Sequence, residues 1–215
     1  MPELSGTGRL ADDLYLIAHH DVSGKPFLQP RALGLGLAGA LLAELVIAGR
    51  IRIGPDAVTV TNATPPDEEL ARTVLGQILG EAQRHPVQTW LQFLGRTATA
   101  EVAERLYRSG YLEHVSQRLP WRGDRWVPVN SDSAFAAFVR VRSVLDASRS
   151  ASASGAILAG LAQACGLGSR LSVAAPSEGR RRSIEEAVRE LGPDLLALIA
   201  QTRAAVDSAL LSQRV

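Results

Sequence analysis

The feature that most constrains this chain is a nearly uncharged segment, residues 33–47, in which Glu44 is the only charged residue. Apolar residues fall on every side of this segment when it is read as a helix, so it must be buried on all sides or lie in a membrane. Its uncharged run ends at Ala43, short of the ~20 residues that a membrane-spanning helix needs. We therefore predict that it is the buried central helix of a folded domain.

Small and turn-forming residues predict the limits and the packing of this central helix. Pro30 can open the helix because a proline at the first helical position loses no helical hydrogen bond. Gly49 suits the position just after the helix end. Ala32, Gly36 and Ala40 are spaced four residues apart and form one small-residue stripe, along which a neighbouring helix can approach closely.

The rest of the sequence predicts an all-α bundle around this helix, with two small β-hairpins. Alternating apolar residues on either side of a Gly-Pro-Asp turn predict the first hairpin at residues 50–61, and the second is predicted at residues 111–129. Helical spacing of apolar residues predicts the remaining helices, and Ser131 or Ser133 is the expected cap of one of them. These helices cover residues 10–18, 65–84, 87–94, 98–109, 134–146, 156–165, 184–191 and 194–211.

The length, the net charge and the N-terminal residues limit the classes of protein to which this chain can belong. A chain of 215 residues can bury a sizeable core, and we expect a single domain over residues 9–215 after a short tail, residues 1–8. The formal net charge of +1 gives no overall attraction to nucleic acid or to an anionic membrane. Because the tail lacks a basic and then apolar signal pattern, we expect a cytoplasmic protein, at most peripheral on the inner face of a membrane.

No group of residues in the sequence indicates catalysis, a metal site or a cofactor site. The His-His-Asp sequence at residues 19–21 has no further His or Cys at metal-ligand spacing, so a solvated loop is expected there. Residues 34–39 match the spacing of a dinucleotide fingerprint, but they lie inside a helix instead of between a strand and a helix. The adjacent Asp12 and Asp13 are interpreted as surface charges. We expect no enzymatic activity and no cofactor, and we place the single cysteine, Cys165, in the core.

The order helix, glycine, strand, turn, strand occurs twice, which is the outline of a winged-helix DNA-binding domain. A recognition helix needs polar side chains that reach the edges of the bases. The central helix offers mainly Leu, Gly and Ala, and the helix at residues 98–109 carries charges of both signs. We therefore expect no nucleic-acid partner.

Three segments combine apolar or aromatic residues with basic ones. The tip of the second hairpin brings tryptophan and arginine together, which suits a protein interface or a headgroup layer unless the indoles fold back onto the core. Its residues are Arg118, Leu119, Trp121, Arg122, Arg125 and Trp126. Phe27 and Leu28 stand at a loop tip before the central helix, where we expect a membrane contact. Residues 176–182, with three successive arginines, are expected in an exposed loop.

With these residues in view, the sequence resembles the Golgi phosphoprotein 3 family, whose domain also occurs in many bacteria. The most specific segment is Gly-Leu-Ala-Gly-Ala-Leu-Leu-Ala-Glu-Leu at residues 36–45, followed by Gly49-Arg50-Ile51. The segments at residues 104–112 and 158–165 resemble further parts of the family pattern. The resemblance covers essentially the whole chain from Leu10 onward.

The resemblance implies a helical bundle around a central hydrophobic helix and a peripheral membrane protein. Eukaryotic members bind the phosphatidylinositol 4-phosphate headgroup and act as adaptors that retain Golgi glycosyltransferases. A projecting hairpin serves self-association in the family, and by position that hairpin is residues 111–129 here.

The family's headgroup pocket uses a tryptophan before the central helix, an arginine in that helix, and two arginines one helical turn apart. In this chain those positions fall at Leu28 or Gln29, at Ala38, and at Arg96 and Thr99. Only Arg96 keeps the family residue, and we expect Arg31 to contribute from the loop. We predict an anionic-headgroup site between residues 27–31 and Arg96. The alternative is a self-associating scaffold that has lost lipid binding.

Overall fold

The computed structural model describes residues 7–115, 125–130, 132–145, 152–169 and 177–212. Within them, nine α-helices and two two-stranded antiparallel sheets confirm the all-α prediction with two hairpins. The helices are α1 (Leu10–Ile17), α2 (Pro30–Ile47), α3 (Glu69–Gly80), α4 (Val87–Leu94), α5 (Ala98–Arg108), α6 (Asp132–Leu145), α7 (Ala153–Ala164), α8 (Ser177–Arg189) and α9 (Pro193–Leu211). The strands are β1 (Ile51–Ile53), β2 (Val58–Val60), β3 (Leu112–Val115) and β4 (Arg125–Pro128), and a short 3₁₀ helix covers Leu167–Ser169.

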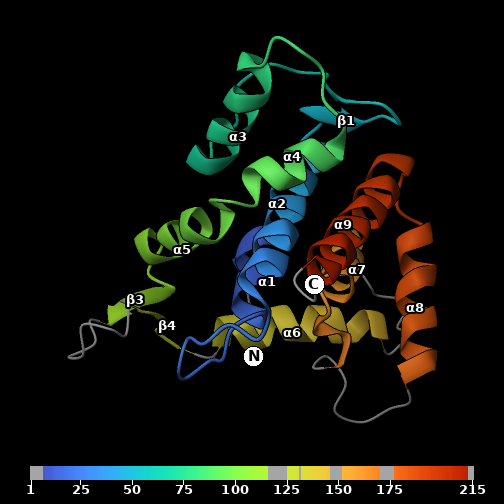
Figure 1. The fold of residues 1–215 in the computed structure, drawn as a ribbon. Helices are drawn as coiled ribbons and strands as arrows, with labels where there is room; N and C mark the ends of the chain where they lie inside the picture. The colour runs from blue at the N-terminus through green and yellow to red at the C-terminus, as the bar shows by residue number, and fades with distance from the viewer. Residues whose placement is uncertain (1–6, 116–124, 131, 146–151, 170–176, 213–215) are drawn as a thin grey trace.

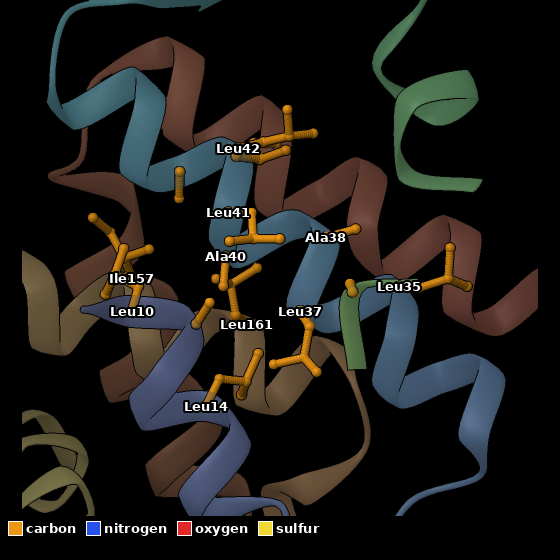
Figure 2. Close-up of a cluster of buried hydrophobic side chains, with 14 of the residues drawn as sticks. Leu10, Leu14, Leu35, Leu37, Ala38, Ala40, Leu41, Leu42, Ile157 and Leu161 are labelled. Atoms are coloured by element: carbon orange, nitrogen blue, oxygen red, sulfur yellow. The ribbon is translucent and has the colours of Figure 1, made fainter. Parts of the chain in front are cut away.

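Helix α2 is the centre of the bundle, as the sequence predicts. It packs against α1, α4, α5, α7 and α9, and in Figure 1 it runs through the middle of the helices. Figure 2 shows its leucine side chains among those of α1 and α7, where Leu37, Leu42 and Leu161 are completely buried. By length and hydropathy α2 would also pass for a membrane span, but 72% of it is buried inside the fold. Its apolar surface is therefore used to build the core.

The local signals at the ends of α2 are confirmed. Pro30 occupies the first turn, and Gly49 follows the helix with a φ of 64°, a left-handed conformation that favours glycine. The small-residue stripe allows the predicted close approach at Gly36, where Cys165 at the end of α7 packs directly against α2. Cys165 is 2% exposed and lies in the core, as predicted.

Both hairpins form where the sequence places them. Ile51 pairs with Val60 in the first, and His114 pairs with Trp126 in the second. The strands of the first are buried on one side, because Ile51 and Ile53 are 1% and 5% exposed whereas Arg52 between them is exposed. Residues 116–124, which include most of the predicted hairpin tip, lie outside the described residues.

Several helix boundaries differ from the sequence prediction. Helix α3 begins only at Glu69, because Glu68 acts as its N-cap by accepting hydrogen bonds from the N–H groups of Leu70 and Ala71. Helix α6 begins at Asp132, so Ser133 is not its cap, and Ser131 is outside the described residues.

The prediction of an exposed loop at residues 176–182 is wrong, because α8 begins at Ser177. Arginine and glutamate are good helix formers, and Arg181 pairs with Glu185 one turn later, with Nε and Oε1 3.3 Å apart. Pro176 itself lies outside the described residues.

Candidate functional site

The structure brings Arg31 and Arg96 to neighbouring surfaces through a contact of two glycine backbones. A β-carbon added to Gly34 would lie 2.2 Å from the carbonyl oxygen of Gly95, so α2 touches the link between α4 and α5 directly. Arg96 follows Gly95, and Arg31 precedes Gly34 by one helical turn. Both arginine side chains are exposed. Two segments separated by some sixty residues of sequence thus meet at glycines close in sequence to two exposed arginines.

The beginning of α2 adds positive potential to these side chains. The first N–H groups of a helix have no partners within the helix, and the helix dipole places a partial positive charge there. In α2 the N-cap residue Gln29 makes no capping hydrogen bond, and the first turn contains no acidic residue. Such an end can receive an anion through backbone N–H groups while Arg31 supplies a full charge.

The other residues predicted for the headgroup site have mixed surroundings. Gln29 is exposed and Thr99 is half-buried, so both can take part in a surface site. Ala38 is completely buried in the core, in agreement with the predicted burial of the central helix on all sides. Leu28 is half-buried and packs against the core, as does Phe27.

Exposed apolar side chains occur in the segments that carry the two arginines, partly at positions that the sequence did not indicate. Phe93 is 48% exposed at the end of α4, and its carbonyl accepts the N–H of Arg96 at 3.3 Å. In the loop before α2, Val22 is 76% exposed, more than either Phe27 or Leu28. The exposed position of Phe93 follows from the amphipathic pattern of α4, in which Trp90 and Leu91 face the core.

Trp126 of the second hairpin folds back onto the domain. It is half-buried, packs against the core, and has ring centroids 5.0 Å from those of Tyr107 and His114. Arg125 donates from Nη1 to the carbonyl of Ser23 at 3.1 Å, which ties the hairpin to the loop after α1. Arg118, Leu119, Trp121 and Arg122 lie outside the described residues. For Trp126, the interpretation that the indole packs on the core is therefore confirmed.

A buried ion cluster is the main polar feature that the sequence prediction missed. Asp12 and Asp13 are completely buried, so their interpretation as surface charges is wrong. Arg105 reaches Asp12 Oδ1 at 2.6 Å through Nη2, while its Nη1 lies 3.1 Å from Glu68 Oε2 and 3.4 Å from Glu44 Oε2. Three carboxylates from three segments thus share one guanidinium.

The same cluster fixes the start of α1. Glu44 Oε1 accepts the N–H of Ala11 at 2.9 Å, which satisfies a donor that the first helical turn leaves free. Asp13 accepts a hydrogen bond from the Thr7 hydroxyl and pairs with Arg140 of α6. Glu44 and Arg105 both belong to the segments that carry the family resemblance, and their observed role is structural.

Burial and charge set the protonation of this cluster. Burial raises the pKa of Asp12 to about 6, although the Arg105 guanidinium lowers it. Burial also raises the pKa of Glu44, again against the effect of Arg105. Asp12 Oδ2 is buried with no hydrogen-bond partner among the described residues, so this oxygen is where a proton would be held.

We expect the Asp12→Asn variant to flatten the pH dependence of stability. A carboxyl whose pKa rises on folding from 3.8 to about 6 stabilises the fold fully below its unfolded value, and this contribution is lost as the pH rises through 6. The loss amounts to as much as about 3 kcal/mol, since each pKa unit corresponds to about 1.4 kcal/mol. Urea unfolding between about pH 4 and pH 7 measures the slope for both proteins. Asp207→Asn, at an exposed position of α9, is the control. If stability changed with pH equally in the wild type and in Asp12→Asn, the assignment of the pH dependence to Asp12 would be contradicted.

A cavity of about 710 Å³ lies over this cluster, between α3 and α5. Five carboxylates and three arginines line it, together with Trp126. The acidic residues are Asp67, Glu68, Glu69, Glu101 and Glu104, and the basic ones are Arg9, Arg105 and Arg108. Because negative charge is in excess, this cavity does not suit a phosphate group, in contrast to the surface at Arg31 and Arg96.

Among the described residues, no group of three or more His, Cys, Asp or Glu side chains is arranged to hold a metal ion. Residues 19–21 do not form a cluster of imidazoles. His19 is buried, with Nδ1 2.7 Å from the Tyr15 carbonyl, whereas His20 is exposed beside Asp21.

Comparison with known proteins agrees with the fold described above. The family model of Golgi phosphoprotein 3 (GPP34) matches residues 10–211, from the first residue of α1 to the last residue of α9. A comparison with curated proteins gave no match. A match over nearly the whole chain, with the central helix in the expected place, shows the family. The chain therefore belongs to the Golgi phosphoprotein 3 family.

Proposed function

We propose that this protein is a peripheral membrane protein that binds an anionic lipid headgroup at the surface formed by Arg31, Arg96 and the beginning of α2. The observation that carries the proposal is the contact between Gly34 and Gly95, because it joins two exposed arginines to an uncapped helix start. An arginine fork and backbone N–H groups are the donors that phosphate prefers. A headgroup such as phosphatidylinositol 4-phosphate offers that phosphate.

Apolar side chains around the arginines support a membrane over a soluble phosphate compound. Phe93 is exposed three residues before Arg96, Val22 is exposed in the loop that leads to α2, and Phe27 and Leu28 are half-buried later in that loop. Aromatic and apolar side chains next to basic ones are typical of residues that lie in the headgroup layer. We place the protein on the cytoplasmic face of a membrane in a binding role without catalysis.

The test is co-sedimentation with vesicles, using charge-reversal variants at the two arginines. We expect the protein to bind vesicles that contain phosphatidylinositol 4-phosphate or phosphatidylglycerol more strongly than neutral phosphatidylcholine vesicles. Arg31→Glu and Arg96→Glu should each weaken binding to the anionic vesicles about thirty-fold, because each basic residue near an anionic surface contributes about 1 kcal/mol and a charge reversal replaces this attraction by a repulsion of similar size.

The matched control is Arg189→Glu, at an exposed position of α8. Helix α8 lies on the opposite side of the bundle from α5 in Figure 1. Its vesicle binding should equal that of the wild type. Equal recovery of the wild type with neutral and anionic vesicles would overturn the proposal, as would the same loss in the Arg189→Glu control.

Self-association through residues 111–129 and a role as an adaptor stay predictions from the family resemblance. Tyr107, Val115 and Val129, at 46%, 40% and 57% exposure, lie on or beside the described part of the second hairpin and favour a protein contact there.

A further inference from the structure

A second cavity, of about 470 Å³, lies where the end of α1 and the loop after it meet α6, and neither Arg31 nor Arg96 lines it. Its floor is nearly inaccessible, since Leu16 and Leu167 are each 1% exposed and His19 is 7% exposed. The volume lies in the range of cavities that hold small organic ligands. Of the residues that line it, the headgroup proposal above uses only Phe27.

Three phenylalanines form the walls of the cavity. Phe27 comes from the loop after α1, while Phe135 and Phe138 stand one turn apart on α6. Phe135 is 54% exposed, which is unusual for so large an apolar side chain on a helix that packs on the core. Aromatic faces carry negative partial charge, so a group of them attracts organic cations as well as apolar groups.

Two carboxylates stand at the rim of the same cavity. Asp21 and Asp132 are both exposed and both line it. His20 Nδ1 lies 3.2 Å from Asp21 Oδ1 and also accepts the N–H of Val22. Among the residues that the structure describes, no lysine or arginine lines the cavity. The electrostatic potential in the cavity therefore favours a cationic ligand.

His19 gives the floor a single hydrogen-bond acceptor. Its Nδ1 lies 2.7 Å from the Tyr15 carbonyl, which can only accept, so Nδ1 carries the proton and Nε2 has the lone pair. The ring stacks on Tyr15 at 3.9 Å, and burial lowers the pKa of His19, which keeps the ring neutral. No hydrogen bond among the described residues engages Nε2.

We propose that this cavity binds a small quaternary ammonium compound of the choline type. The trimethylammonium group would lie among the three phenylalanines, with Asp21 and Asp132 supplying the opposite charge. The hydroxyl group would donate to Nε2 of His19. The trimethylammonium group could come from free choline or from the headgroup of phosphatidylcholine, in which the hydroxyl oxygen is esterified and has no proton to donate.

The decisive experiment compares choline with its uncharged isostere, 3,3-dimethylbutan-1-ol, by titration calorimetry on the wild-type protein. The two molecules have nearly the same shape, so a difference in affinity reports the positive charge. We expect choline to bind about ten-fold more tightly, because cation–π contacts and carboxylates act only on the cation. Equal affinity for both compounds, or no heat from either at tens of millimolar, would overturn the proposal.

Two substitutions at exposed positions locate the site. Phe135→Leu keeps an apolar side chain but removes the aromatic face, and Asp132→Asn removes one charge without changing its size. Each should weaken choline binding several-fold, and neither should change binding of the uncharged isostere by as much. Phe93→Leu and Asp207→Asn are the controls of the same kind on α4 and α9. If the controls weaken choline binding as much as the site variants do, the cavity is not the site.

A vesicle measurement separates the two sources of the ammonium group. Pure phosphatidylcholine vesicles that retain the wild type better than Phe135→Leu would assign the cavity to the lipid headgroup. Choline binding in solution without such retention would assign it to the free compound. The Arg31→Glu and Arg96→Glu variants should keep wild-type choline affinity, so this inference and the proposed anionic-lipid function can fail separately.

Discussion

Replacing Arg105 with methionine is expected to lower the free energy of unfolding by about 3–5 kcal/mol at neutral pH. The variant leaves the Asp12, Glu44 and Glu68 carboxylates facing one another with no shared cation. The Arg105 and Asp12 side chains are only 6% and 1% exposed, so water cannot screen the repulsion. Methionine fills a similar volume, so the loss reports the charge and not a cavity.

Urea unfolding of the wild type and Arg105→Met at the same pH measures this loss. The matched control is Arg108→Met on the same helix, whose side chain is 59% exposed and pairs with Glu104 and Glu69 at the surface. That control should lose at most about 1 kcal/mol, because exposed ion pairs contribute little. Equal losses in the two variants would show that the cluster does not stabilise the fold as the structure implies.

The pH dependence gives a second readout for Arg105→Met. Without the guanidinium, which lowers the pKa of each of the three carboxyls, these pKa values should rise, so lowering the pH should remove much of the repulsion. The stability difference from the wild type should therefore shrink from about pH 7 to about pH 5. A difference that stays constant over this range would point to lost packing.

Introducing a single methyl group at Gly36 is the second large effect that we expect. The β-carbon of Gly36→Ala would lie 2.2 Å from Sγ of Cys165, so α2 and the end of α7 would be forced apart. Overpacking of this kind in a dense core costs about 1–3 kcal/mol. This cost should exceed the gain in helix propensity, which is about 1 kcal/mol when alanine replaces glycine in a helix.

The structure also predicts a rescue of Gly36→Ala. Once Cys165→Ala removes the sulfur, the nearest atoms to the new methyl group are the β-carbon of residue 165 and Leu14 Cδ2, both at 3.6 Å. The double variant should therefore return to within about 1 kcal/mol of the wild type, and a double-mutant cycle should show a coupling of about 1–3 kcal/mol. Additive effects of the two substitutions would contradict this packing.

Gly76→Ala on α3 is the control for the glycine substitution. A β-carbon at Gly76 would meet no atom within 4 Å, and this residue is exposed. The control should therefore gain stability, by about 1 kcal/mol, while Gly36→Ala loses it. The same substitution would thus raise the stability in α3 and lower it in α2. This difference in sign would result from the close approach of α2 and the end of α7 at Gly36.

The segments that carry the family resemblance now have a structural explanation. Glu44 and Arg105 meet in the buried ion cluster, and Gly49 ends α2 in a left-handed conformation. These residues build the architecture, so their presence identifies the fold without indicating a ligand. The residues on which the two binding proposals rest, Arg31 and Phe135, lie outside those segments and are exposed.

The sequence by itself determined the elements whose signals are local. The limits of α2 follow from Pro30 and Gly49, and its burial follows from fourteen uncharged residues out of fifteen in residues 33–47. The first hairpin follows from alternating apolar residues around a Gly-Pro-Asp turn. Each of these signals acts within a few residues, so no knowledge of distant segments is needed.

Only the tertiary structure decided which side chains meet. Asp12 looks like a surface charge until Arg105, 93 residues later, is brought beside it, because a carboxylate can be buried only when a partner arrives with it. The same holds for the contact of Gly34 with Gly95 and for the cavity that joins His19 to Phe135. Charge pairing, close backbone approach and cavities form only when helices from distant parts of the chain pack together. The nearly uncharged central helix therefore indicates the fold from the sequence, whereas the candidate sites depend on which segments pack around it.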